Sequence, residues 1–188
     1  MPIIAGIDPS LTGFAVCVGD GQDDAVARFS SSKLGEGVVP RMKRIDMLVG
    51  DAMKLLDEWR PDAIFIEAYS FGSKFNREVM AEVGAIARWH LVDFTDKVFE
   101  VAPTTLKKFT TGSGKGQKDQ MAAHVVKRWK RMFSNNDEVD AFALYRLGLV
   151  AAGVVEPDNL NQEGACSTVL KGLNLKLELQ STLDHPAF

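Results

Sequence analysis

Residues 1–14 read Met1-Pro-Ile-Ile-Ala-Gly-Ile-Asp8-Pro-Ser-Leu-Thr-Gly13-Phe14, an apolar run that stops at an aspartate and a turn. The isoleucines and the alanine before Asp8 are typical of a buried strand, and the proline and glycine after it are typical of a turn. Residues 14–18 then predict a returning strand, which places Asp8 at the tip of the first strand beside a hairpin. An aspartate there either hydrogen-bonds the turn or binds a metal, and this stretch leaves both interpretations open.

The length and composition fit one globular domain. The chain has 188 residues, of which 46% are hydrophobic, and this is enough to bury a core without disulfides or a structural metal. Its two cysteines, Cys17 and Cys166, are far apart in sequence and form no zinc-binding or disulfide pattern, so we expect both to be buried as small apolar residues. Neither a secretory leader pattern nor a run of membrane-spanning length is present, which predicts a cytoplasmic protein with no membrane partner.

The charges are distributed unevenly along the chain. The net charge is -3, but residues 101–132 contain eight lysines and arginines against a single acid, and acids outnumber basic residues in the remainder of the chain. A basic segment of this kind predicts contacts with nucleic-acid phosphates. For residues 127–131 a solvated helix face is an equally good interpretation. Lys107, Lys115 and Lys118 fit a solvated face less well, because they flank a glycine-rich turn.

The hydrophobic pattern predicts an α/β fold. Three strands at 2–8, 14–19 and 25–32 follow one another closely, which favours an antiparallel meander. Short apolar runs at 63–66 and 98–101 then alternate with segments of helical spacing, which favours parallel strands joined by helices. The helices are expected at 40–59, 76–92, after Pro103, at 119–132 and at 136–151. We therefore expect a mixed central sheet, in which an antiparallel three-strand meander is followed by parallel strands, flanked by helices.

The end of the chain differs from the rest. After Gly153 the pattern weakens into proline, asparagine, glycine and serine, and only residues 169–179 are apolar enough to suggest structure. We therefore predict one domain over residues 1–152 and a partly ordered C-terminal appendage over residues 153–188.

Acidic side chains recur at the ends of the predicted elements. Glu67 follows the strand at 63–66, and Asp137 and Asp140 are three residues apart, which puts them on one face of a helix while Glu138 points elsewhere. Acids gathered at one sheet edge repel each other unless divalent cations hold them, and oxygen ligands without nearby cysteine or histidine favour Mg²⁺ or Mn²⁺ over Zn²⁺. The alternative for Asp137 and Glu138 is that acids in a first helical turn complement the helix dipole. This alternative explains Asp140 less well, because its neighbours are apolar.

The order and spacing of these elements resemble those of the RuvC-type Holliday-junction resolvases, in the RNase H-like superfamily. Ile4-Ala-Gly-Ile-Asp8-Pro-Ser resembles the family's first strand with its catalytic aspartate, and Ala63-Ile-Phe-Ile-Glu67 resembles its strand that ends in a catalytic glutamate. Asp137-Glu-Val-Asp140-Ala-Phe-Ala-Leu resembles its final acidic pair on a helix. Leu106-Lys107-Lys-Phe-Thr-Thr-Gly112 and the later Lys118 fall where the family carries lysines that serve substrate phosphates. The resemblance spans about residues 2–150.

The resemblance implies an RNase H-like fold and the activity of a crossover junction endodeoxyribonuclease, which hydrolyses phosphodiesters by a two-metal mechanism. It implies that the catalytic residues and metal ligands are Asp8, Glu67, Asp137 and Asp140, which would hold two Mg²⁺ ions per site, with Mn²⁺ able to substitute. The implied substrate is a four-way (Holliday) or related branched DNA junction, cut by paired nicks in a homodimer, with no small-molecule cofactor. Ser10, where the family usually has glycine, is a departure that bears on substrate preference, as is the segment after Gly153.

The predicted DNA contacts come from two segments. The candidates for phosphate contacts are four lysines of the basic segment: Lys107, Lys118, Lys108 and Lys115. The residues that follow Glu67 fall where the family meets the opened junction core, and the candidates there are Tyr69, Phe71, Phe75 and Arg77. An aromatic ring in this segment could stack on an unpaired base, or it could hold the following helix against the core. Gly84, in that helix, is our candidate for close packing at the dimer interface.

Two other functions fit parts of the sequence. Gly6-Ile-Asp8-Pro-Ser-Leu-Thr12-Gly13 also resembles the first phosphate hairpin of actin-like and sugar-kinase-like ATP-binding proteins. Those proteins have two such domains and a second glycine-rich aspartate loop, which this sequence lacks, and residues 112–118 do not have the spacing of a P-loop. The other alternative is a non-catalytic branched-DNA binder on the same fold, and the presence of all four carboxylates speaks against a purely structural role.

Overall fold

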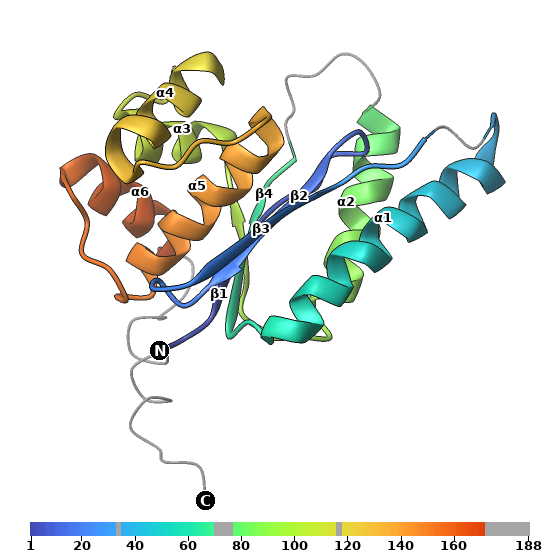
Figure 1. Ribbon diagram of the computed structural model, residues 1–188, viewed down its shortest axis with the longest axis horizontal. Coiled ribbons are helices and arrows are strands. Elements are labelled where there is room, and N and C mark those ends of the chain that lie inside the picture. The colour runs from blue at the N-terminus through green and yellow to red at the C-terminus, as the bar shows by residue number, and fades with distance from the viewer. Residues whose placement is uncertain (33–34, 70–76, 116–117, 172–188) are drawn as a thin grey trace, which may run out of the picture.

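A five-stranded mixed sheet runs through the centre of the molecule (Figure 1). The computed structural model describes residues 1–32, 35–69, 77–115 and 118–171. The strands lie in the order β3-β2-β1-β4-β5, with the bounds β1 Ile4–Asp8, β2 Phe14–Gly19, β3 Asp24–Phe29, β4 Ala63–Glu67 and β5 Val98–Val101. The first three strands pair antiparallel, whereas β4 pairs parallel with both β1 and β5. The sheet therefore confirms the predicted fold class.

Helices cover both faces of the sheet. One face carries α1 (Val38–Trp59) and α2 (Arg77–Leu91), and the other face carries the later helices (Figure 1). The later helices are α3 (Pro103–Thr111), α4 (Lys118–Trp129), α5 (Asn136–Ala151) and α6 (Leu160–Leu170). In the parts of the chain that the structure describes, none of the helices combines the length and the apolar character that crossing a membrane requires.

The two faces of the sheet bury different cores, because successive side chains of a strand point to opposite faces. Ile4 of β1 and Phe65 of β4 belong to the core under α5, whereas Ile7 of β1 and Ile66 of β4 belong to the core under α1 and α2. All four side chains are fully buried. Strands that are buried on both faces need no polar alternation, which explains the continuous apolar sequences of β1 and β4.

Helix α5 packs directly on the backbone of β1. A Cβ atom on Gly6 would lie less than 3.0 Å from the backbone nitrogen of Tyr145 and from the backbone oxygen of Ala141. The hydroxyl of Tyr145 also accepts a hydrogen bond from the backbone N–H of Gly21, at 2.9 Å, which ties α5 to the turn between β2 and β3. The absence of a side chain at Gly6 therefore sets how closely α5 approaches the sheet.

Helix α6 was not predicted from the sequence. It begins at Leu160, before the segment 169–179 that the sequence suggested, and the part of that segment after residue 171 lies outside the described residues. Ala165 and Cys166 of α6 are buried in the core that α5 covers, so this part of the predicted appendage packs against the domain. The helix gives a weak sequence signal because it buries small side chains and the amide of Gln162, which is 1% exposed, instead of a stripe of large apolar residues.

Helix α4 is shorter than predicted. The predicted helix extends to residue 132, but α4 ends at Trp129 and Lys130 adopts a left-handed backbone conformation with φ of 58°. Beyond this point Arg131 forms two hydrogen bonds with the carboxylate of Asp24 on β3, at 2.8 and 2.9 Å. Part of the basic run at 127–131 therefore serves to hold the chain to the edge of the sheet.

Candidate metal centre

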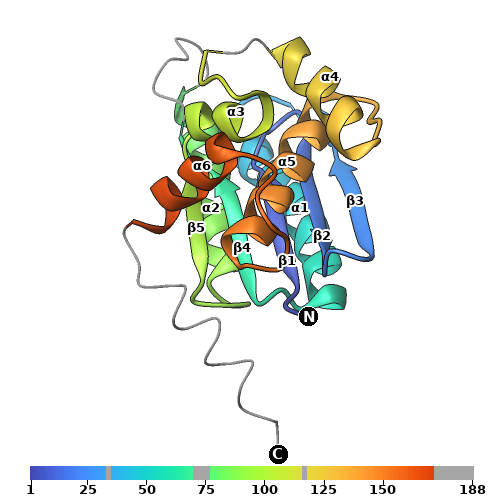
Figure 2. The same ribbon diagram turned by 90° about the vertical axis from the view of Figure 1, so that its left-hand side faces the viewer.

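Asp8 and Glu67 end two neighbouring parallel strands. The pairing of β1 with β4 brings Ile7 opposite Ile66, so the next residues, Asp8 and Glu67, end their strands side by side. Because side chains alternate along a strand, both acids continue the face that packs under α5. Figure 2 shows this end of the sheet close to α3 and α4.

Asp140 on α5 completes a cluster of three carboxylates. Asp140 directly precedes Ala141, one of the α5 residues that lie against Gly6, so the close packing of α5 brings it to the end of β1. One carboxylate oxygen from each of Asp8, Glu67 and Asp140 lies within 4.8 Å of the other two. Asp8 and Asp140 are each only 8% exposed. Negative charges this close and this buried repel one another unless a cation or a proton compensates them.

The donor set of the cluster fits a divalent cation. All three ligands are carboxylate oxygens, which suit Mg²⁺ and Mn²⁺ and do not select Zn²⁺. Adjacent oxygens on an octahedral Mg²⁺ ion with bonds of about 2.1 Å stand roughly 3.0 Å apart, and opposite ones roughly 4.2 Å. Oxygens within 4.8 Å of one another are therefore near enough for side-chain rotations to bring them to one ion.

Asp137, the fourth predicted ligand, is ion-paired with an arginine. Arg28 of β3 donates from Nε to Oδ2 of Asp137 at 2.9 Å, and from Nη2 to the carbonyl oxygen of Thr12 at 2.8 Å. Gly13 leaves room for this pair, because a Cβ there would lie less than 3.0 Å from both side chains. Asp137 is one helical turn away from Asp140, and its role as a metal ligand stays a prediction.

Glu138 has a structural role at the start of α5. The side chain of Asn135 accepts a hydrogen bond from the backbone N–H of Glu138 at 2.9 Å, and the Glu138 carboxylate accepts one from the N–H of Ser134 at 3.0 Å. These reciprocal contacts are similar to a capping box, which satisfies backbone donors that a helix leaves unpaired at its first turn. Glu138 therefore helps to fix where α5 begins, and with it the place of Asp140.

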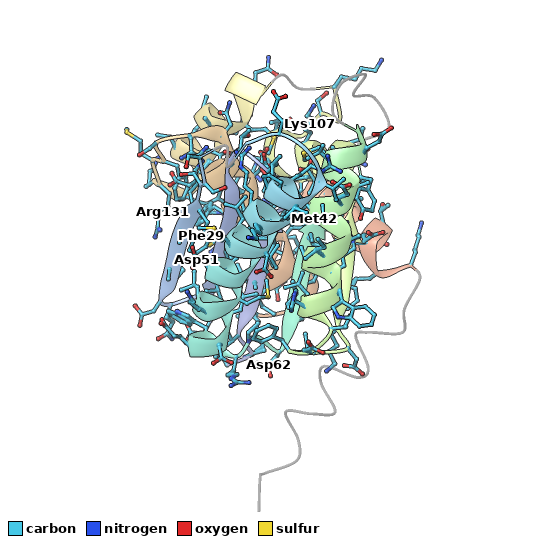
Figure 3. The ribbon with its side chains drawn as sticks, turned by 90° about the vertical axis from the view of Figure 1, so that its right-hand side faces the viewer. Phe29, Met42, Asp51, Asp62, Lys107 and Arg131 are labelled. Carbon is cyan, nitrogen blue, oxygen red and sulfur yellow. The ribbon has the colours of Figure 1, made fainter. Side chains whose placement is uncertain are left out.

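The predicted phosphate-contact lysines whose side chains are described lie in different surroundings. Lys107 of α3 is half-buried, and Figure 3 shows it at the end of the molecule opposite Asp62, which lies just before β4. Lys108 is exposed and its Nζ lies 3.7 Å from the place that a Cβ on Gly164 would take, so it extends toward α6. Lys115 is exposed in the turn after α3.

Several predicted contact residues fall outside what the structure describes. Phe71 and Phe75 lie in the undescribed segment 70–76. Lys118 and Arg77 are the first residues of α4 and α2, but their side chains are not among those described. Their roles stay predictions.

Tyr69 lies against α2. Its ring occupies the space beside Gly84, where a Cβ would be 2.7 Å from the ring, and its hydroxyl donates to the carbonyl oxygen of Ala81 at 3.4 Å. The guanidinium of Arg88 lies over the ring, 4.3 Å from its centre. The space at Gly84 is therefore filled from within the chain. The ring holds the segment after Glu67 against the helix, which is the alternative that the sequence left open, and base stacking by Tyr69 stays a prediction.

Two arginines that contact this region were not found from the sequence. Arg28 occupies a strand at the edge of the meander, where a charged residue usually faces solvent, and Arg88 occupies the last turn of α2, where a cation usually complements the helix dipole. Neither belongs to a motif. Only the pairing of distant segments shows that Arg28 reaches Asp137 and that Arg88 reaches the backbone of Glu67.

Known proteins match the segment that carries the carboxylates. The family model described as crossover junction endodeoxyribonuclease RuvC matches residues 4–145. The chain is 29% identical over 130 residues to the RuvC crossover junction endodeoxyribonuclease of Cytophaga hutchinsonii, and this match covers 66% of the chain and 64% of the relative. It is also 29% identical over 125 residues to the corresponding protein of Ruminiclostridium cellulolyticum, covering 63% of the chain and 73% of that relative.

A solved structure shares the fold. The structure of T. thermophilus RuvC in complex with Holliday junction substrate has a TM-score of 0.57 and 18% sequence identity, and the match covers 77% of this chain and 91% of that one. This likeness concerns the fold. The chain spans 64% of the length of the Cytophaga relative, so the match leaves part of that protein uncovered. Because the family model covers well over half of the sequence, from β1 into α5, the chain belongs to the RuvC family of crossover junction endodeoxyribonucleases.

Proposed function

We propose that the protein is a metal-dependent endodeoxyribonuclease that resolves four-way (Holliday) and related branched DNA junctions by paired nicking. The observation that carries the proposal is the cluster of Asp8, Glu67 and Asp140, on a chain of a family named for this activity. A cluster of this kind suits phosphodiester hydrolysis, because it holds cations against a substrate that is itself anionic.

The proposed cofactor is Mg²⁺, with two ions per site and Mn²⁺ able to substitute. When bound, such a pair generates a nucleophilic water and stabilises the attacking and leaving oxygens of an in-line displacement. Asp8 is the proposed shared ligand, because its strand pairs with the strand of Glu67 and is covered by the helix of Asp140. Asp137 is proposed as the fourth ligand, and in that role it would have to leave Arg28 or be shared with it.

The proposed homodimer follows from the substrate. A four-way junction presents two equivalent strands to cut, and a two-fold symmetric pair of sites matches that geometry. Helix α2 is the proposed interface element, because it carries Trp89, which is 76% exposed, and Met80, which is 37% exposed. Since Tyr69 fills the space at Gly84, that glycine would support the interface by seating Tyr69 and not by direct contact between helices.

The activity can be tested with labelled four-way junctions, flaps, forks and linear duplex in Mg²⁺, Mn²⁺ or EDTA. We expect symmetric nicks in the junction with either metal, no cutting in EDTA, and much slower cutting of duplex. Equal cutting of junction and duplex contradicts junction selectivity. Tight junction binding without cutting in either metal supports the non-catalytic branched-DNA binder, and ATP hydrolysis supports the actin-like alternative, which the family match does not favour.

The Lys107→Ala variant is expected to weaken junction binding. Loss of one phosphate contact should lower the affinity in EDTA by on the order of 5-fold at low salt and reduce the slope of log K against log salt by about 1. Fluorescence anisotropy at several salt concentrations measures both quantities.

The neighbouring Lys108→Ala variant is the matched comparison, because Lys108 is also a candidate for a phosphate contact and has the same charge, but it extends toward α6. We expect it to lower the affinity and the slope less than Lys107→Ala does. If Lys108→Ala has the larger effect, the assignment of the phosphate contact to Lys107 is wrong.

A further inference from the structure

Arg88 joins α2 to the ends of two strands. Its Nη2 donates to the backbone carbonyl of Glu67 on β4 at 3.0 Å, and its Nε donates to Oε1 of Glu100 on β5 at 2.6 Å. Its Nη1 donates to the carbonyl of Gly84, one turn earlier on α2, at 3.0 Å. Each guanidinium nitrogen therefore has a different partner, and the partners lie on three elements.

The flat face of the same guanidinium is also in use. It lies over the ring of Tyr69, 4.3 Å from the ring centre, at a distance where a cation is attracted to an aromatic face. Gly84 makes the arrangement possible, because a Cβ there would lie 2.7 Å from the ring and 2.8 Å from Nη1 of Arg88. The glycine at position 84 is thus explained, because the absence of a side chain leaves room for the Tyr69 ring and the Arg88 guanidinium.

Arg88 approaches Glu67 from the side of the sheet away from the metal centre. The carboxylate of Glu67 continues the face of β4 that packs under α5, whereas α2 lies on the other face (Figure 1). Glu100 follows Phe99, which packs under α5, so alternation directs Glu100 toward α2. Arg88 therefore holds the backbone of Glu67 from the face of the sheet opposite the metal centre. It does not compete for the carboxylate oxygens of Glu67.

We propose that Arg88 is a positioning residue for the metal centre: through one guanidinium it fixes the backbone of Glu67 and the root of the segment after Tyr69, so that the Glu67 carboxylate meets those of Asp8 and Asp140. The proposal rests on the proposed metal-dependent function. It assigns to α2 a part in metal binding although α2 lies in the opposite layer. It also places the metal ligand and the start of a segment predicted to meet DNA under the control of the same side chain.

The contacts require arginine and not merely a positive charge. The guanidinium offers a rigid planar fork and a flat face, whereas the lysine ammonium is a compact point charge that cannot reach three acceptors and cover a ring. The side chain of Arg88 is only 19% exposed, so its contacts are largely shielded from water. An Arg88→Lys variant keeps the charge near the site but removes the fork, which separates geometry from long-range electrostatics.

Arg41 of α1 provides a matched control, because it pairs with a glutamate of α2. It forms two hydrogen bonds with Glu82 of α2, at 2.7 and 2.9 Å, and its side chain is 34% exposed. This ion pair ties α2 to α1, and among the described residues it forms no hydrogen bond with β4 or β5. Arg41→Lys therefore disturbs an arginine–glutamate pair at α2 without touching the backbone of Glu67.

The test compares Mn²⁺ binding to the two variants in the absence of DNA, measured by the loss of the free Mn²⁺ signal in electron paramagnetic resonance. Loss of a group that orients a metal ligand typically costs 10- to 100-fold, so we expect the Mn²⁺ Kd of Arg88→Lys to rise by about 10-fold. Arg41→Lys should stay close to wild type. Junction binding in EDTA should be unchanged in Arg41→Lys, and the Mg²⁺ concentration for half-maximal cutting should rise only in Arg88→Lys.

Equal Mn²⁺ affinities for the two lysine variants would overturn the proposal, while leaving the proposed function intact. A wild-type protein that binds no Mn²⁺ and cuts no junction would instead overturn the proposed function. Glu100→Gln, with Glu82→Gln as its control, repeats the test at a position that is 53% exposed and should leave the fold unchanged. The expected rise in the Mn²⁺ Kd for Glu100→Gln is about 2- to 5-fold, the equivalent of one exposed ion pair. If the Mn²⁺ Kd rises in neither Arg88→Lys nor Glu100→Gln, the role of Arg88 is excluded.

Discussion

The Asp8→Asn variant is expected to lose metal-dependent cutting while it still binds junction DNA. Asparagine has nearly the same shape as aspartate but removes the charge that faces Glu67 and Asp140. Loss of a group that only orients a metal ligand costs at most about 100-fold, and loss of the ligand itself should cost more. We therefore expect the cutting rate to fall by more than about 100-fold. Single-turnover cutting measures the loss, and gel shift in EDTA measures the binding. Glu67→Gln and Asp140→Asn should behave in the same way.

The same variant should also lose stabilisation by metal. A ligand that binds only the folded state at ten times its Kd stabilises that state by about 1.4 kcal/mol. For a chain of this size that corresponds to a rise in Tm of roughly 3–6 °C in the wild type. Differential scanning fluorimetry in Mg²⁺ and in EDTA should show this rise for the wild type and not for Asp8→Asn.

The control for Asp8→Asn is Asp51→Asn, an equivalent change at a half-exposed position on α1 (Figure 3), where Asp51 pairs with Lys54 three residues on. We expect it to cut junctions normally and to respond to Mg²⁺ as the wild type does. An Asp8→Asn protein that still cuts, or that is stabilised by Mg²⁺ to the same extent as the Asp51→Asn protein, would show that Asp8 is not a metal ligand.

The Gly6→Ala variant is expected to be strongly destabilised. The added Cβ would lie less than 3.0 Å from backbone atoms of Tyr145 and Ala141, which cannot rotate away, so α5 must shift off the sheet. Overfilling a packed core typically costs 1–3 kcal/mol, and we expect a loss in the free energy of unfolding of about 3 kcal/mol. Because Asp140 precedes Ala141, the remaining folded protein should also bind Mn²⁺ more weakly. Urea denaturation followed by circular dichroism measures the loss in stability.

Gly50→Ala is the control for this change. A Cβ on Gly50, within α1, would meet nothing within 4 Å. Alanine is favoured over glycine in a helix interior by about 1 kcal/mol, so this variant should be slightly more stable than the wild type. If both alanine variants were equally stable, the close approach of α5 to β1 would not be what Gly6 provides.

Much of the fold could be predicted from the sequence, because its signals are local. The continuous apolar runs of β1 and β4, each ended by an acid, and the regular apolar spacing of α1 can be recognised without knowledge of the neighbours. The convergence of Asp8 and Glu67 also follows, once parallel pairing of β1 and β4 is expected, since parallel strands end at the same edge. Helix α6 escaped detection because its burial rests on small and polar side chains.

The contacts that hold the carboxylates could not be predicted in the same way. Arg28 and Asp137 lie far apart in sequence, as do Arg88 and Glu67, and no motif in the sequence indicates either contact. The sequence suggests Gly84 as a site of close packing at a dimer interface, whereas the space beside it is filled by a tyrosine ring from a different segment of the same chain. Single-sequence patterns reveal which face of an element is buried, but they do not reveal which polar group from another layer will reach it.

The contribution of α5 to the acidic cluster also sets when the cluster can form during synthesis of the chain. Asp8 and Glu67 belong to strands that leave the ribosome early, whereas Asp140 leaves it late and reaches its place only when α5 settles on Gly6. A nascent chain that has already made β1 to β5 therefore lacks the third carboxylate and cannot assemble the cluster. The three-carboxylate cluster is thus completed only when α5 closes the domain.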